Sequence, residues 1–180
     1  MLAAIYLFVR LFAGPIGIIE PAADPKATAD DVLAMMAKLP VVEVPKTPDQ
    51  NRVGHWERIG IARELAAVIA EVAPTRTAAS LHVVYAAFEG GNQRCAAGDG
   101  GKSLGPYQLQ RLPESVACDP LAAARIWQER ANYSWKRCTK NPPEEKLAQL
   151  ASGSCDNGHV LTRRRAKIAA RIAEVELPQE

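Results

Sequence analysis

The chain lacks a strong charge of either sign, and it has few aromatic residues. Its 180 residues carry 22 basic and 20 acidic side chains, for a formal net charge of +2. So small a bias gives no argument for nucleic-acid binding, and we expect none. Apolar residues make up 48% of the chain, which is typical of a folded globular domain rather than a disordered tail.

Clustered metal ligands and familiar nucleophile motifs are also missing. The three histidines are scattered, and no two of the four cysteines form a CxxC pair. This pattern argues against a zinc site, so we expect neither a metal nor a cofactor. No nucleophile-elbow pattern accompanies any serine, which argues against a Ser-His-Asp hydrolase.

The cysteines that are present suit two disulfides. They are even in number and fall at comparable intervals, at Cys95, Cys118, Cys138 and Cys155. Among the three possible connectivities we favour Cys95–Cys118 and Cys138–Cys155. Each bridge contributes on the order of 3 kcal/mol in the chain-entropy model and indicates a site outside the reducing cytosol. Four buried thiols are the alternative.

The N-terminal segment, residues 1–23, is apolar from Leu2 to Ile19 apart from Arg10. It predicts an export signal, or a membrane anchor formed by residues 1–19. No basic residue precedes the apolar run and Pro15 interrupts it, so a packed N-terminal helix or a misplaced start codon are the alternatives. Together with the disulfides, the segment predicts an exported protein of the periplasm, the cell envelope or the extracellular space.

Two further regions follow. Residues 24–53 begin with a short amphipathic helix, which Thr28 or Asp30 can cap, and continue with three prolines in nine residues that indicate an extended linker. Residues 54–177 form the main domain. It is expected to be mainly α, with a Gly-rich loop or short hairpin after its second helix.

Apolar periodicity predicts the helices of this domain. They run from Trp56 to before Pro74, from a Thr77 cap to Glu89, from about Pro120 to Tyr133, from about Pro143 to Ala151, and from about Val160 to Val175. In the last helix we expect Leu161, Ile168, Ile172 and Val175 to face inward. We expect Arg163, Arg164 and Arg165 to form a solvated face, and contact with phosphate or wall polymer is the alternative. Trp127, Tyr133 and Trp135 suit either the core or a sugar platform, and we expect Trp127 in the core.

Glu89 stands at the end of its predicted helix, because Gly90 and Gly91 can supply the left-handed C-cap. The helix dipole and the neighbouring Phe88 both disfavour an ionised carboxylate there. A glutamate that keeps its proton near neutral pH is what a general acid for glycosidic cleavage needs. A surface glutamate near a helix end is the alternative.

The loop after Glu89 reads "GDGGKSLGPYQLQ", with four glycines in eight residues. Such glycines let the backbone approach a bulky ligand closely. Tyr107 offers an aromatic ring, and Gln108 offers an amide, to a sugar and its acetamido group. The alternative is a plain hairpin turn.

Together these features resemble the lysozyme-like superfamily, nearest to the single-glutamate, SLT-type lytic transglycosylases and the goose-type and invertebrate-type lysozymes. Glu89-Gly90-Gly91 matches the glutamate motif that ends a helix in these families, which is usually "ES" plus a small residue. Gly105-Pro106-Tyr107-Gln108 is similar to the "CGPFQI" of invertebrate-type lysozymes. The resemblance covers roughly residues 56–175 and is most specific over residues 85–110.

The resemblance implies a lysozyme-like α-helical domain, acting as a monomer on peptidoglycan strands, from a bacterium or, if virion-associated, from a phage. Glu89 would protonate the β-1,4 bond between N-acetylmuramic acid and N-acetylglucosamine. Asp99 would be the second carboxylate of a lysozyme, unless it points away or is only an Asp-Gly turn residue. In that case Glu89 would act as acid and then as base, and the muramic 6-hydroxyl would attack to give a 1,6-anhydro end.

The substrate-binding residues implied by the resemblance are Ser103, Gly105, Tyr107, Gln108 and Ser152. The chain departs from the families at the later "AYNAG"-like motif, where it has "AQLASGSC". Leu150 and Ala151 stand at the tyrosine and asparagine positions, so Tyr85 or His82 is the candidate to orient Glu89, unless both only pack. A non-catalytic wall-binding or structural module on the same fold is therefore the alternative function. A membrane-anchored interaction protein is the second alternative.

Overall fold

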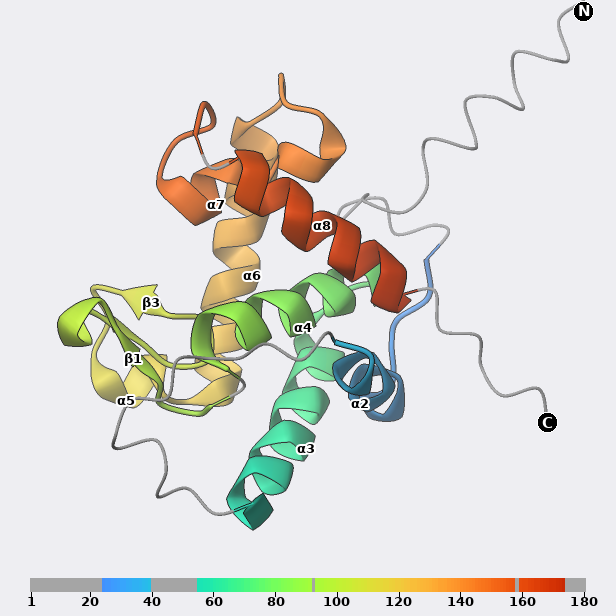
Figure 1. Ribbon diagram of the computed structural model, residues 1–180, viewed down its shortest axis with the longest axis vertical. Coiled ribbons are helices and arrows are strands. Elements are labelled where there is room, and N and C mark those ends of the chain that lie inside the picture. Colours follow the sequence, from blue (N-terminus) through green and yellow to red (C-terminus); the bar gives the residue numbers. More distant parts are fainter. Residues whose placement is uncertain (1–23, 40–54, 92, 158, 174–180) are drawn as a thin grey trace, which may run out of the picture.

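The computed structural model describes residues 24–39, 55–91, 93–157 and 159–173 (Figure 1). Within these ranges the chain forms seven α-helices, two short 3-10 helices and one small three-stranded sheet, so the predicted mainly α class is confirmed. The predicted export segment, residues 1–23, and the proline-rich stretch at 40–54 lie outside the described residues. None of the described helices is long and apolar enough to cross a membrane.

Helix α2 (Ala29–Ala37) begins at Thr28, one of the two predicted caps. The Thr28 side chain accepts from the Asp31 backbone N–H while Asp31 accepts from the Thr28 N–H, which is a reciprocal capping box. Val32 and Met35 on its inner face are fully buried. The helix packs against α3 and α4, so residues 24–39, grouped with the linker in the sequence analysis, contribute to the core of the main domain.

Helices α3 (His55–Val72) and α4 (Arg76–Gly90) follow, and α4 runs through the middle of the domain (Figure 1). Nearly every residue of α4 is buried, because α2, α3 and α8 pack around it. An apolar surface on all sides of a helix is expected for such a position. The predicted Thr77 cap was wrong, since the side chain of Thr75 accepts from Ala78 N–H and Thr77 N–H donates to Asp24.

The Gly-rich loop folds into the antiparallel sheet β1 (Ala97–Gly98), β2 (Ser103–Leu104) and β3 (Leu109–Gln110), with the 3-10 helix η2 (Asp99–Gly101) after β1. Ala97 pairs with Leu104, and Leu104 pairs with Leu109. The short helix α5 (Glu114–Ala117), which periodicity did not predict, follows. The predicted Cys95–Cys118 disulfide ties the start of this region to its end.

The rest of the domain is helical. It comprises α6 (Pro120–Arg137), η3 (Pro143–Glu145), α7 (Ala148–Ser152) and α8 (His159–Ala173). The single helix predicted over 143–151 was wrong. The chain leaves helical geometry between η3 and α7, where the Lys146 carbonyl accepts a hydrogen bond from Ser134 Oγ of α6 at 2.8 Å. The predicted Cys138–Cys155 disulfide joins the end of α6 to the α7–α8 connection.

Helix α8 packs along α4, with Ala169 and Ile172 buried in the contact. Ile168 is partly buried, as predicted, but Leu161 is exposed and its predicted inward position was wrong. Leu161 lies in the first turn of α8, whereas the buried apolar residues of this helix, Ala166, Ala169 and Ile172, lie further along it. Val175, also predicted to face inward, lies outside the residues that the structure describes.

Candidate active site

A cleft of about 630 Å³ opens between the end of α4, the small sheet, α6 and α7. Six of the seven predicted site residues line it, and they come from five separate elements and loops: Glu89, Asp99, Ser103, Tyr107, Gln108 and Ser152. Gly105 does not line the cleft. The fold therefore brings together side chains up to 63 residues apart in sequence, counting from Glu89 to Ser152.

Glu89 lies in the last turn of α4, and the helix ends as predicted at Gly91, which has a left-handed φ of 59°. The partner of its carboxylate is an arginine that the sequence analysis missed. Arg165 Nη1 of α8 lies 2.6 Å from Glu89 Oε1. Arg165 is only 5% exposed, so the prediction of a solvated face was wrong for this residue, although Arg163 and Arg164 are exposed.

Helical spacing contained the signal for Arg165. It precedes the buried Ala169 by four residues and the buried Ile172 by seven, so it lies on the inward stripe of α8. A buried guanidinium requires an opposite charge or acceptors, because an isolated ion is costly to desolvate. Glu89 supplies the charge, and the ring of Tyr85 lies 4.5 Å from the Arg165 guanidinium carbon as a cation–π contact.

Tyr85 therefore supports Arg165, and Arg165 pairs with Glu89. Burial raises the pKa of the Tyr85 hydroxyl, and the nearby Arg165 charge opposes that rise. The hydroxyl interacts with Arg165 and Thr162 of α8. The side chain that orients Glu89 is thus Arg165, in the place for which the sequence suggested Tyr85 or His82.

His82 is fully buried one turn before Tyr85 and links α4 to the loop of the cleft. Its Nδ1 lies 2.8 Å from the Tyr107 hydroxyl, and its Nε2 lies 2.9 Å from Gln128 Oε1 of α6. Gln128 Nε2 donates onward to Asn132 Oδ1. Because the Gln128 oxygen can only accept, Nε2 carries the His82 proton and Tyr107 donates to Nδ1. Burial lowers the pKa of His82 to about 4, with the Gln128 hydrogen bond acting in the opposite sense.

Tyr107 is therefore held by His82 within the packed protein, and it is not a free aromatic platform for a ligand. Its ring stacks on Trp127, with centroids 5.5 Å apart, and burial raises the pKa of its hydroxyl. Trp127 is buried as predicted, and it also contacts His82 and Tyr85. Both rings reach the cleft from this packed cluster.

The Gly105–Gln108 turn is fitted closely against two helices. Gly105 has a φ of 81°, and an added Cβ would lie 1.8 Å from the Ala117 carbonyl oxygen. At Gly90 an added Cβ would lie 2.6 Å from the Pro106 carbonyl oxygen. Gly90 therefore lets Pro106 rest directly on the end of α4, beside Glu89. These contacts explain both glycines by steric fit. The sequence analysis explained Gly105 by the approach of a ligand and Gly90 by the helix C-cap.

Gln108 lines the cleft, but its amide nitrogen is used within the protein. Nε2 donates to the carbonyl oxygens of Ala96 and Gly105, at 2.8 and 3.1 Å. Its backbone is left-handed, with a φ of 49°. The carbonyl oxygen of the Gln108 amide lies against Gly98, where an added Cβ would be 2.1 Å from it.

Asp99 lies across the sheet and lines the same cleft as Glu89. It adopts a left-handed φ of 50°, as an Asp-Gly turn residue can. Its Oδ2 accepts from Ser103 Oγ at 2.7 Å and from Gln110 Nε2 at 3.3 Å. Asp99 is therefore both a turn residue and a cleft residue, and Ser103 contacts it directly.

The opposite wall is made by α7 and the facing turns of α6. Leu150 and Ala151 line the cleft at the positions where the resembling families have tyrosine and asparagine. Ser134 Oγ of α6 accepts from Leu150 N–H at 3.3 Å and so holds α7 in place. Ser152 Oγ donates to the Ala148 and Ser154 carbonyls, and α7 ends at Gly153 with a φ of 77°.

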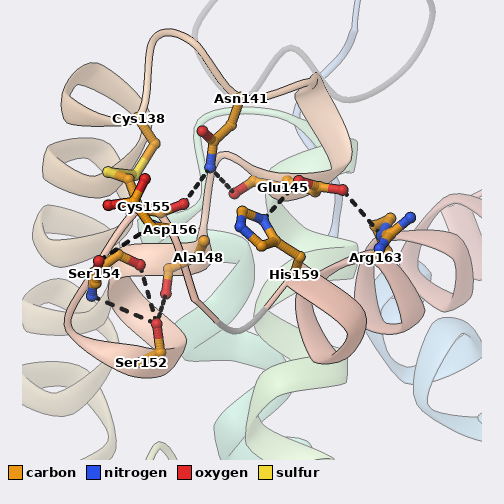
Figure 2. A network of polar contacts seen from close by, with 10 residues as sticks. All are labelled: Cys138, Asn141, Glu145, Ala148, Ser152, Ser154, Cys155, Asp156, His159 and Arg163. Carbon is orange, nitrogen blue, oxygen red and sulfur yellow. Dashed lines mark hydrogen bonds and ion pairs between the residues drawn. A yellow bond between two sulfur atoms is a disulfide. The ribbon is translucent and has the colours of Figure 1, made fainter.

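Figure 2 shows the polar network that supports this wall from behind. Glu145 Oε2 lies 2.6 Å from His159 Nδ1, and Glu145 Oε1 lies 3.0 Å from Arg163 Nε. Asn141 Nδ2 donates to the Cys155 carbonyl at 2.8 Å. The network and the Cys138–Cys155 bridge connect η3, the α7–α8 connection and α8.

Among the described residues, one group of three potential metal ligands lies within 4.8 Å, formed by Cys95, Glu114 and Cys118. The two sulfurs are bonded to each other, so they offer no thiolate.

The cleft itself presents two carboxylates, one paired with a buried cation and one held by neutral donors. Both carboxylates can accept hydrogen bonds or a proton from a bound ligand.

The chain has no match among protein-family models, curated proteins or solved structures.

Proposed function

We propose that the protein is a peptidoglycan-cleaving glycosidase with a lysozyme-like α-helical domain and with Glu89 as the general acid. The observation that carries the proposal is the shared cleft of Glu89, Asp99 and the Tyr107–Gln108 turn. In this arrangement a helix ends in a glutamate beside a packed glycine-rich turn. The sequence resemblance implies glycosidic cleavage for such an arrangement. Two disulfides support an exported location, where this polymer is found.

In the first step, Glu89 would give its proton to the oxygen of the β-1,4 bond, and the bond from the muramic C1 to that oxygen would break. Glu89 then becomes an anion, and the Arg165 guanidinium lies 2.6 Å from its oxygen. An ion pair this close stabilises the anion that forms. Arg165 would therefore act on the glycosidic bond through Glu89, as a positioning residue.

The second step has two forms. In hydrolysis, Asp99 would act as nucleophile or base, and water would supply the new oxygen at C1. In the anhydro-forming reaction, Glu89 would take the proton of the muramic 6-hydroxyl, whose oxygen would attack C1. The donors of Ser103 and Gln110 hold the Asp99 carboxylate in the cleft, which favours neither form over the other.

A non-catalytic wall-binding module is the second candidate. The observation that favours it is at Leu150 and Ala151 of α7, which line the cleft where the resembling enzymes have polar side chains. A module of this kind would keep the cleft and lose the chemistry, since one fold supports many functions.

The test is to incubate the full chain, with its disulfides formed, with purified peptidoglycan and to analyse the released muropeptides by mass spectrometry. Wild type is compared with Glu89→Gln and with Glu129→Gln, which changes an exposed glutamate of α6 outside the cleft. We expect Glu89→Gln to lower release by at least about 100-fold, as for loss of a general acid, and Glu129→Gln to leave it unchanged.

The ends of the products then separate the two mechanisms. Anhydro ends indicate a transglycosylase, and reducing ends indicate a lysozyme and assign a role to Asp99. If folded wild-type protein binds peptidoglycan and releases nothing, the glycosidase proposal is wrong and the binding module replaces it.

A further inference from the structure

Arg130 of α6 lines the cleft and makes no ion pair or hydrogen bond with any described residue. It is the one basic side chain in the lining of the cleft, as far as the described residues extend. Glu89 is already paired with Arg165, and Asp99 accepts from Ser103 and Gln110. The guanidinium of Arg130 therefore offers a full set of N–H donors to a bound ligand.

Tyr133 accompanies Arg130 on the next turn of the same helix. The two residues are three apart, so they lie side by side on one face of α6. Tyr133 also lines the cleft, and it is 55% exposed, which is unusual for an aromatic residue of this domain. Arg137 Nη1 lies 3.2 Å from the Tyr133 hydroxyl and steadies the ring from the following turn.

The position of the pair follows from its neighbours on α6. Trp127 packs against Tyr85 and Tyr107, and Ser134 Oγ accepts from Leu150 N–H of α7. Arg130 and Tyr133 lie between these two residues on α6, and the step from Trp127 to Tyr133 advances about 9 Å along the helix axis. They therefore form the part of the cleft between the Trp127 cluster and α7.

We propose that Arg130 and Tyr133 form a binding site for a carboxylate-bearing saccharide unit, which rests on the Tyr133 ring and pairs its carboxylate with Arg130. A guanidinium fork fits a carboxylate in two-point fashion, and an exposed ring fits the apolar face of a sugar. This inference rests on the proposed function, and it names the feature of the polymer that the cleft recognises. In a peptidoglycan strand the carboxylate is that of the muramic lactyl group or of the peptide attached to it.

The test measures dissociation constants by isothermal titration calorimetry with the full chain carrying Glu89→Gln, which binds without turnover. Three tetrasaccharides are compared. The first is two linked N-acetylglucosamine–N-acetylmuramic acid units with free lactyl groups, the second is the same tetrasaccharide with its peptides, and the third is neutral chitotetraose. Into this background are placed Arg130→Gln, Arg130→Lys and Tyr133→Ala. Lys136→Gln, an exposed cation of α6 outside the cleft, is the matched control.

We expect Arg130→Gln to raise the dissociation constants of the carboxylate-bearing ligands by about tenfold or more, since the lost interaction is a charged hydrogen bond. The dissociation constant of chitotetraose should not change. Arg130→Lys keeps the charge and should recover part of the loss. Tyr133→Ala should weaken all three ligands alike, because the ring meets the sugar and not its charge. The lactyl and peptide ligands, compared with each other, show which carboxylate is bound.

Equal weakening of charged and neutral ligands by Arg130→Gln, or no weakening at all, overturns the carboxylate site and leaves the glycosidase proposal standing. Circular dichroism of each variant excludes a folding defect as the cause. If the Glu89→Gln protein binds none of the three saccharides, the inference and the proposed function both fail.

Discussion

The two walls of the cleft are built on different principles. The α4 wall presents polar groups that are fixed from within, through the contacts of Arg165 with Glu89 and of His82 with Tyr107 and Gln128. The α7 wall presents the apolar Leu150 and Ala151, and it is held from behind by a disulfide and by the partly exposed Glu145 network. The first wall pairs a buried arginine with a partly exposed carboxylate, and the second pairs the largely buried Glu145 carboxylate with more exposed cations.

Under the proposed function, this difference would separate the residues of the chemistry from those of binding. Burying polar groups is costly, and a fully partnered network fixes their geometry in return. That cost is reasonable where a proton must be transferred to one atom, and unnecessary where a wall only receives a ligand. The α4 wall should therefore be sensitive to single substitutions, and the α7 side of the cleft should tolerate them with effects confined to binding.

The largest effect is expected from Arg165→Met. The change removes the cation from a buried position and leaves the Glu89 carboxylate without its partner, so the free energy of unfolding should fall by about 3 kcal/mol. Muropeptide release should fall with it, because Glu89 loses the group that orients it. Chemical denaturation and mass spectrometry of the products measure the two effects.

Arg164→Met is the matched control for this change. Arg164 is the exposed neighbour of Arg165 on α8, and its loss should change the free energy of unfolding by less than about 0.5 kcal/mol. Arg165→Lys retains the charge but not the planar fork, so we expect an intermediate stability. Equal stability of Arg165→Met and Arg164→Met would show that the pair with Glu89 contributes nothing.

The α4 wall also shows how far the sequence could be read. Gly91 as the C-cap of α4, the helical class and both disulfides were predicted, because each depends on local signals or on a short list of pairings. Arg165 was missed because three consecutive arginines suggest solvent. Its inward position depends on the register of α8 against α4, which only the packed structure fixes.

The loop residues illustrate a second limit. Tyr107 and Gln108 were expected to reach for a sugar, yet the Tyr107 hydroxyl and the Gln108 amide nitrogen bind within the protein. Sequence identifies polar groups, and it does not show which of them the fold consumes. Arg130 is the converse case, since nothing in its local sequence marks it, and it becomes a candidate only because none of the described residues pairs with it.

The next effect concerns pH and the buried His82. Burial lowers its pKa to about 4 in the folded protein, against about 6.5 when unfolded. Between pH 6.5 and 4 the unfolded chain therefore binds a proton at His82 that the folded chain does not bind. The contribution of neutral His82 to the free energy of unfolding is complete above pH 6.5 and falls as the pH drops towards 4. The full loss from this group is on the order of 3 kcal/mol.

Denaturation curves at several pH values between 7 and 4 measure this loss, and NMR of the His82 ring follows its protonation directly. His159→Gln, on the α7 side, is the control. Its free energy of unfolding should fall with pH as in the wild type, because His82 is intact. A His82 ring that titrates in the folded protein near pH 6.5 would contradict the buried network.

The smallest effect is expected at Gly90, where the resembling families usually have serine. Gly90→Ser adds a Cβ that would lie 2.6 Å from the Pro106 carbonyl oxygen, and backbone on both sides leaves little room to move. Overpacking of this kind costs about 1–3 kcal/mol, and it should push the Gly105–Gln108 turn away from Glu89. Thermal unfolding should therefore show a lower melting temperature for Gly90→Ser and for Gly90→Ala alike, since both add the same atom. A more stable Gly90→Ser protein would mean that the turn can shift at no cost, and the α4 wall would then be less rigid than its contacts indicate.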